Sequence, residues 1–218
     1  MEVYDHIDAM KSRIIIGEDQ STCDHIILYS TGLCAKLKNA EYALSKIREL
    51  YNKSDSSILT SGFSNGDIFH FYLDSFFAFL YSAFDIIAQV INQKYRLRLN
   101  EDRVSFKSVE RNLNQSHQNS AIYNHVRNTL NKRFFKALDK YRNFSTHRRQ
   151  IYIQNRTTQV SGTPGYTTSA EITRIERIIC DDPLVLVPTV NKNRELITYC
   201  SDILNKTLKE NIKLTKVI

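Results

Sequence analysis

The chain has 218 residues and a mass of 25.4 kDa, so it is long enough to bury a core without structural metals or disulfides. Its 30 Lys and Arg against 23 Asp and Glu leave a net charge of +7, which favours nucleic acid over an acidic protein as a partner. Composition therefore predicts a single domain, residues 1–218, and excludes a scaffold that depends on disulfides.

The sequence has four scattered cysteines, Cys23, Cys34, Cys180 and Cys200. They form no C-x-x-C pair and no spacing typical of a zinc site, which predicts mostly buried thiols in a reducing compartment. The first ten residues, MEVYDHIDAM, lack the basic flank and the apolar stretch of an export signal. We expect a cytoplasmic protein with no metal site and no cofactor.

Residues 1–22 show little periodicity and contain Gly17, so we expect an arm that packs loosely or pairs elsewhere. From Cys23 to Tyr51 the pattern changes, and apolar or small residues recur every three or four positions, which predicts a long amphipathic helix. This stripe consists of Ile26, Ser30, Leu33, Leu37, Ala40, Leu44, Ile47 and Tyr51. The turn-forming residues of 54–66 separate it from the next helix.

Residues 68–91 are apolar enough to resemble a transmembrane helix. The acids Asp74 and Asp85 argue against a membrane span, because each would cost about 2.5 to 3.5 kcal/mol at bilayer depth. We therefore predict a core helix over about Asp67–Lys94 with one inward apolar face: Phe69, Leu73, Phe76, Leu80, Phe84, Ile87 and Ile91. The residues of a second stripe on this helix are small or polar, which allows another helix to approach closely. An acid on this stripe would either bind a basic side chain of a neighbouring helix or face solvent. Its residues are Asp74, Ala78, Ser82, Asp85 and Gln89.

Between residues 97 and 131 the sequence is polar and predicts a short helix over Phe106–Leu113, a loop, and a turn or two near Val126. A helix with an apolar stripe then follows, with Phe134, Phe135, Leu138, Tyr141 and Ser145 on one side. After Arg149 alternating residues and the turn Gly162–Gly165 predict a small antiparallel β element. A last helix is expected from Asn191 to about Ile212.

The helix before residue 150 ends in YRNFSTHRR, which carries the chemistry of interest. Asp139, Asn143 and His147 are four residues apart and share one face, so Asn143 is placed to orient the imidazole of His147. Arg142 lies about 140° round the helix from His147, so the two side chains converge only if the helix end frays or a second subunit takes part. Asp85 and Asp139 are candidate supporting acids.

The frame R-N-x-x-x-H at Arg142–His147 resembles the R-x(4–6)-H signature of HEPN (higher eukaryotes and prokaryotes nucleotide-binding) domains. The apolar helix over Leu73–Asn92 is also similar to the central helix of bacterial members. The likeness covers about Cys23–Arg149 and the last helix. It implies a mainly α, antiparallel helical bundle with a small β-hairpin insertion, residues 150–190, before the C-terminal helix.

The resemblance further implies a homodimer whose two motifs face a shared cleft, and a metal-independent endoribonuclease. His147 would act as general base or acid at the ribose 2′-hydroxyl, and Arg142 would hold the phosphate. Arg148 and Arg149 would add phosphate affinity, or serve as ordinary surface charge. A role as a toxin with an antitoxin partner protein, or in defence, is implied by the family alone.

Two alternatives stay open. The motif residues also suit a solvated helix C-terminus, where cations favour the negative end of the dipole. A non-catalytic module that binds a nucleotide, RNA or a protein would share the same fold. A second match to the signature, Arg111 to His117, runs into an amide-rich loop without apolar periodicity, and we therefore reject it as a site.

Overall fold

The computed structural model describes residues 2–52, 65–147, 152–160, 170–179 and 193–218. The described chain is mainly helical, and the predicted helical-bundle class is confirmed. In chain order the elements are α1 (Glu2–Ile15), α2 (Gln20–Asn52), α3 (Asn65–Lys94), the 3₁₀ turn η1 (Glu101–Arg103), α4 (Phe106–Ser116), α5 (Ala121–Asn131), α6 (Arg133–His147), β1 (Tyr152–Val160), β2 (Ala170–Ile179) and α7 (Asn193–Val217).

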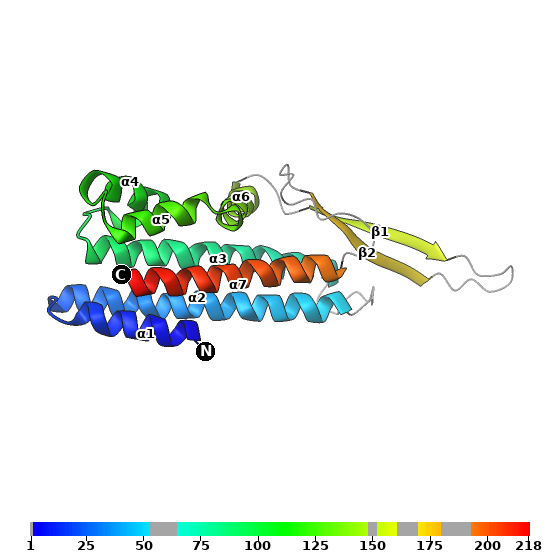
Figure 1. The fold of residues 1–218 in the computed structure, drawn as a ribbon. Helices are drawn as coiled ribbons and strands as arrows, with labels where there is room; N and C mark the ends of the chain where they lie inside the picture. The colour runs from blue at the N-terminus through cyan, green and yellow to red at the C-terminus, as the bar shows by residue number, and fades with distance from the viewer. Residues whose placement is uncertain (1, 53–64, 148–151, 161–169, 180–192) are drawn as a thin grey trace, which may run out of the picture.

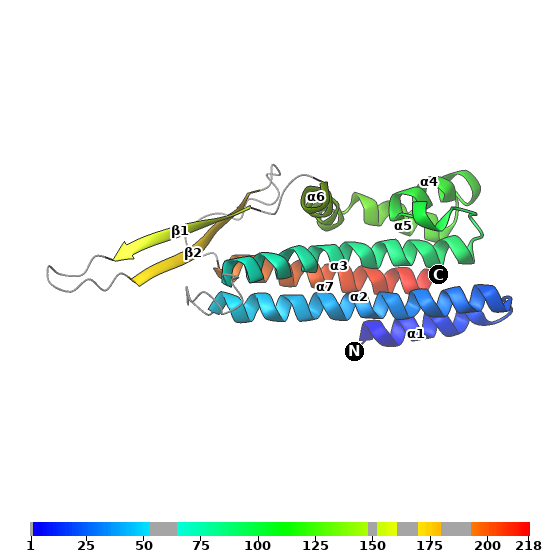
Figure 2. The same cartoon turned by 180° about the vertical axis from the view of Figure 1, so that it is seen from behind.

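The three longest helices, α2, α3 and α7, lie side by side, and α2 runs antiparallel to the other two (Figure 1). Helix α1 packs on the outside of α2, whereas α4, α5 and α6 lie across the opposite side of α3 (Figures 1 and 2). The helix that ends in the motif therefore rests on α3.

The prediction of a loose N-terminal arm is wrong, because most of residues 1–22 form α1 and the start of α2. The sequence signal for α1 was the helical spacing of four apolar residues, which are all buried in the structure: Val3, Ile7, Met10 and Ile14. Arg13 donates a hydrogen bond to the backbone carbonyl of Thr215 in α7, at 2.6 Å. Gly17 follows α1 with a φ of 85°, which suits glycine and turns the chain into α2.

Helix α2 confirms the predicted helix and begins three residues earlier, at Gln20. The Asp19 carboxylate accepts hydrogen bonds from the backbone N–H and the hydroxyl of Thr22, which caps the helix N-terminus. The predicted stripe is buried at every position from Ile26 to Ile47.

Helix α3 confirms the predicted core helix. The face predicted to point inward is buried throughout: Phe69, Leu73, Phe76, Leu80, Phe84, Ile87 and Ile91. Within the part of the chain that the structure describes, Ile68–Lys94 is also the one stretch long and apolar enough to cross a membrane, but half of it is buried inside the bundle. Burial against several helices accounts for its apolar composition.

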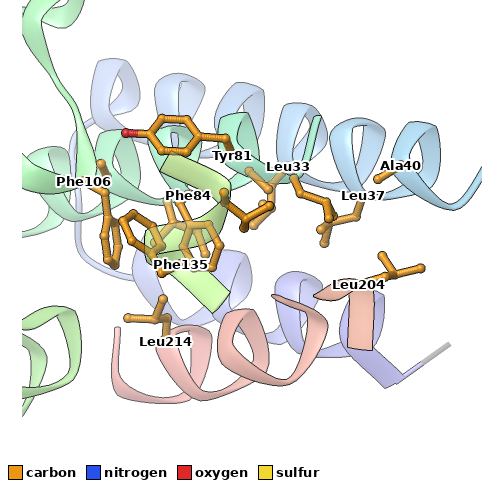
Figure 3. Close-up of a cluster of buried hydrophobic side chains, with 14 of the residues drawn as sticks. Leu33, Leu37, Ala40, Tyr81, Phe84, Phe106, Phe135, Leu204 and Leu214 are labelled. Atoms are coloured by element: carbon orange, nitrogen blue, oxygen red, sulfur yellow. The ribbon is translucent and has the colours of Figure 1, made fainter. Parts of the chain in front are cut away.

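Three phenylalanines join α3 to the helices above it. Phe84 lies 5.4 Å from Phe106 of α4 and 5.0 Å from Phe135 of α6 between ring centroids, in edge-to-face geometry (Figure 3). Such pairs contribute about 0.5 to 1.5 kcal/mol beyond simple burial. The cluster fixes where α6 crosses α3.

Helices α4 and α5 are each longer than predicted, and each has a serine cap. Ser105 and Ser108 form a reciprocal capping box at α4, and the Ser120 hydroxyl accepts the N–H of Tyr123 at α5. The expected turn or two near Val126 is an 11-residue helix, since Ile122, Val126 and Thr129 are buried. The loop between the two helices shrinks accordingly.

Strands β1 and β2 pair antiparallel from Tyr152↔Ile179 to Val160↔Ala170, with one irregularity between Gln154 and Asn155. The predicted turn Gly162–Gly165 lies outside the described residues. That residues 150–190 form an insertion stays a prediction. Helix α7 confirms the expected C-terminal helix and continues to Val217.

A buried carboxylate ties α5 to α7. The side chain of Glu210 is 3% exposed; it accepts hydrogen bonds from the Thr129 hydroxyl at 2.6 Å and from Lys132 Nζ at 2.5 Å. Burial alone would raise the pKa of Glu210, but these bonds and the charges of Lys132 and Lys213 lower it overall. The ionised form is therefore the one that stabilises the fold.

We expect Glu210→Gln to lower the free energy of unfolding at pH 7 by about 2 to 3 kcal/mol, because it removes charge-assisted hydrogen bonds from a buried site. The difference should shrink in acid below the ordinary glutamate pKa of 4.5, since a lowered pKa stabilises only above that pH. Urea unfolding checks this. Asp202→Asn, at an exposed pair with Lys206, is the control and should change stability by less than about 0.5 kcal/mol; an equal loss in both variants would contradict the account.

Candidate functional site

The motif lies where the sequence places it, at the C-terminal end of a helix. Arg142, Asn143 and His147 all belong to α6, and His147 is its last residue. The structure describes the His147 backbone within α6 but not the surroundings of its side chain, and Arg148 and Arg149 lie outside the described residues. The part of the site that can be built is the half around Arg142.

Apolar packing sets the rotation of α6 about its own axis. Phe134, Phe135, Leu138 and Tyr141 are buried, as predicted. Tyr141 stacks on Phe77 of α3, with ring centroids 3.9 Å apart and planes 5° from parallel. Since Arg142 follows Tyr141 directly, this contact fixes the direction in which Arg142 leaves the helix.

The guanidinium of Arg142 lies over the ring of Tyr81 on α3, with 5.2 Å between its carbon and the ring centroid. A cation over an aromatic face gains about 0.5 to 2 kcal/mol, depending on exposure to water. Arg142 also donates a hydrogen bond of 3.4 Å to Oδ1 of the adjacent Asn143. The arginine is half-buried and held from two sides, and Asn143 orients Arg142 in this structure.

Asp139, one turn before Arg142, is held by two donors. Its carboxylate accepts a hydrogen bond of 3.2 Å from the Tyr81 hydroxyl and one of 2.6 Å from Lys107 Nζ of α4. One acid thus links α3, α4 and α6. Asp139 is thus joined to Tyr81, and its distance from the His147 side chain is outside the described geometry.

Tyr81 is the residue that sequence reasoning missed. It is 4% exposed, and its hydroxyl points away from Leu33 at the edge of the aromatic cluster (Figure 3). Burial, followed by the negative charges of Asp85 and Asp139, raises the pKa of Tyr81, so it stays a neutral hydrogen-bond donor. No local pattern distinguishes Tyr81 from the other aromatic residues of α3, because its hydroxyl partner, Asp139, lies on another helix.

Asp85 lies on the same side of α3, where it accepts a 3.4 Å hydrogen bond from the backbone N–H of Phe106. Burial raises the pKa of Asp85 to about 6, although the Phe106 N–H and the charge of Arg142 act in the opposite direction. A carboxyl with a raised pKa loses stabilising effect as the pH rises from about 4 to about 6. Asp85 therefore contributes less to stability at neutral pH than in acid.

Asp74 resembles Asp85 in its environment. It is half-buried, and burial raises its pKa to about 6. Both acids are partly exposed, so the alternative that they face solvent stays open. The structure thus brings together Arg142, Asn143, Asp139 and Asp85, with Tyr81 and Lys107 as additional members.

Comparison with protein families identifies this arrangement. The family model described as Cthe2314-like HEPN matches residues 29–182, more than two thirds of the chain. The chain belongs to the HEPN family. Comparisons with curated proteins and with solved structures found no match. The matched range contains α3, α6 and the whole motif, and it also spans β1 and β2.

The second match to the HEPN signature gives no comparable cluster. Arg111 is exposed on α4, and His117 is the residue that follows the helix. The His117 ring packs edge-on against Tyr95 at 5.5 Å, and its Nδ1 lies 2.7 Å from the Ser116 hydroxyl. Neither residue contacts a carboxylate among the described residues, so Arg111 and His117 serve as controls in the HEPN protein.

Proposed function

We propose that this HEPN protein is a metal-independent endoribonuclease that cleaves RNA by attack of the ribose 2′-hydroxyl. The observation that supports this proposal most is the fixed position of Arg142, which is half-buried over the Tyr81 ring and interacts electrostatically with Asp85. An ordinary surface arginine at a helix end needs none of these contacts. A guanidinium that is held in place before RNA binds is suited to stabilise the negative charge that develops on the phosphorane in the transition state.

In this reaction one group removes the proton of the 2′-hydroxyl, and its oxygen forms a bond to phosphorus. The bond from phosphorus to the 5′-oxygen breaks, and that oxygen leaves with a proton. His147 serves as general base or acid for these transfers, while Arg142 neutralises charge on the phosphoryl oxygens. The products are a 2′,3′-cyclic phosphate and a 5′-hydroxyl. DNA, which lacks the nucleophile, is spared.

We further propose that two copies complete the site. Arg142 and His147 stand five positions apart on α6, about 140° round the helix, so one protomer does not aim both at one phosphate. The side of α3 next to Tyr81 carries the small residues Ser75, Ala78 and Ser82, flanked by the half-buried acids Asp74 and Asp85. Phe71 is 65% exposed, and Figure 2 shows α2 and α3 in front of α7 with no helix over them.

A stripe of small residues fits a second α3 related by a two-fold axis. We expect Ala78→Glu to weaken the dimer by about 100-fold or more, because each protomer would bring a carboxylate to the axis. Sedimentation velocity measures the change. Ala121→Glu, at an exposed alanine on α5, is the matched control and should leave the association unchanged. A wild-type protein that sediments as a monomer at micromolar concentration would contradict the dimer.

The test of the function is cleavage of a single-stranded RNA in EDTA beside the same sequence as DNA. The proposal predicts that RNA is cut and DNA is not. If neither is cut while RNA binds, the chain is a non-catalytic HEPN module that binds RNA. If cleavage requires a divalent cation, or if DNA is also cut, the proposed chemistry is wrong.

A further inference from the structure

The positive charge of the protein is concentrated in one segment. Residues 121–149, which comprise α5, α6 and the two residues after α6, contain eight of the 30 Lys and Arg but only one of the 23 acids. That segment has a charge of +7, equal to the net charge of the whole chain, so the remaining 189 residues are balanced. The basic character of this protein is therefore local, and it coincides with the helix that carries the motif.

Within that segment, three cations lie on one exposed face of α6. Arg133, Lys136 and Lys140 are spaced by three and four residues and are all exposed. Continued along the helix, the same spacing reaches Asn143 and His147, so the backbone position of His147 lies on this face. The acid of α6, Asp139, points instead to Tyr81 and Lys107. We call Arg133, Lys136 and Lys140 the α6 basic face.

Two cations of this face, Arg133 and Lys136, form no ion pair with a described acid, in contrast to the neighbouring Lys132, which is bound to Glu210. Neighbouring cations that the fold leaves unpaired repel each other, which favours a role in binding a polyanion. The buried Glu210 shows that the chain does pair lysines where structure alone requires it.

The surroundings distinguish nucleic acid from a membrane. A helix that binds an anionic bilayer places exposed apolar residues beside its cations. The exposed large hydrophobic residues of the described chain are Ile16, Ile27, Leu28, Tyr42 and Phe71, none of which lies in residues 121–143, where side-chain burial is described. Within that range no exposed large hydrophobic residue accompanies the cations of the α6 basic face, as expected for contact with a phosphate backbone.

We propose that the α6 basic face binds the sugar–phosphate backbone of single-stranded RNA and leads the strand toward His147. A single strand fits because in-line attack by a 2′-hydroxyl requires a backbone freedom that a duplex lacks. The choice of RNA rests on the proposed function, but the binding itself needs no cleavage. Binding is therefore measured on an RNA that cannot be cut.

The test uses a fluorescent 20-nucleotide 2′-O-methyl RNA, titrated by anisotropy over a salt series. The triple variant Arg133→Gln, Lys136→Gln, Lys140→Gln should bind at least ten-fold more weakly than wild type at low salt. Its slope of log K against log salt should be shallower by about 2, since each lost contact to a single strand removes about 0.7. The matched control is Lys11→Gln, Lys38→Gln, Lys46→Gln on α1 and α2, which changes the net charge equally on the far side of the bundle (Figure 1).

The inference is overturned if the two triple variants bind alike, if wild type does not bind the RNA, or if the α6 variant loses binding only to anionic vesicles. An unchanged melting temperature shows that the α6 variant is folded. If wild type binds but never cleaves unmodified RNA, the ribonuclease fails and the binding face stands. If wild type cleaves while the α6 variant binds normally, the face fails and the ribonuclease stands.

Discussion

Replacing His147 with alanine is expected to lower the rate of RNA cleavage about 10²- to 10⁴-fold, which is the usual effect of removing a general acid or base. The substitution lies at the last residue of α6, beyond the buried stripe that holds the helix on α3, so the fold should be unaffected. RNA affinity should change little, because the cations that attract phosphate remain. Cleavage of a labelled RNA under single-turnover conditions measures the effect.

His117→Ala is the matched control for this variant. It removes the histidine of the second signature match, which packs against Tyr95 and belongs to no cluster of charged groups. Its cleavage rate should equal that of wild type. If both histidine variants keep full activity, His147 has no role in proton transfer, and any activity observed comes from elsewhere.

Replacing Arg142 with alanine is expected to lower cleavage about 10²- to 10³-fold, because a preorganised donor to the developing charge is lost. Arg142→Lys should restore little of this rate. An ammonium group cannot form a bidentate hydrogen bond to a phosphate, and it cannot stack as a planar group on Tyr81. Arg111→Ala, at an exposed arginine on α4, is the control with no expected effect. Full activity of Arg142→Ala would contradict the assigned role.

Tyr81 variants separate the roles of its ring, which lies beneath Arg142, and its hydroxyl, which binds Asp139. Tyr81→Phe keeps the ring beneath Arg142 and removes only the hydrogen bond to Asp139, so we expect it to retain most of the activity. Tyr81→Leu removes the ring and should lower activity about five-fold, in keeping with a cation–π contact of about 1 kcal/mol. An NMR chemical-shift change of the assigned Arg142 Nε–H signal in the leucine variant, but not in the phenylalanine variant, would show that the ring positions the guanidinium.

Periodicity in the sequence was enough to place the elements that carry the site. The stripes of α2, α3 and α6 were predicted and are buried, because a spacing of three or four apolar residues reports directly which face of a helix turns inward. The same rule would have found α1 from Val3, Ile7, Met10 and Ile14, but the short polar stretches between these residues obscured the pattern. The position of Arg142 and His147 near a helix end was likewise readable from local sequence.

What periodicity does not provide is the set of contacts between helices. Asp85 and Asp139 were predicted as supporting acids, yet the linking residues, Tyr81 and Lys107, follow only from the angle at which α4 and α6 cross α3. In sequence, Tyr81 is one more aromatic residue on an apolar helix. The concentration of charge in residues 121–149 was present in the sequence, but its meaning depended on knowing that Asp139 turns inward and leaves three cations on the outer face of α6.

The central claim is that Arg142 and His147 act together on one phosphodiester of RNA. Its most direct test is the chemistry of the RNA ends produced in EDTA by wild type and by the double variant Arg142→Ala, His147→Ala. We predict 2′,3′-cyclic phosphate and 5′-hydroxyl ends from wild type and no cleavage by the folded double variant. Ends that carry a 5′-phosphate, or an unchanged pattern from the double variant, would contradict the claim.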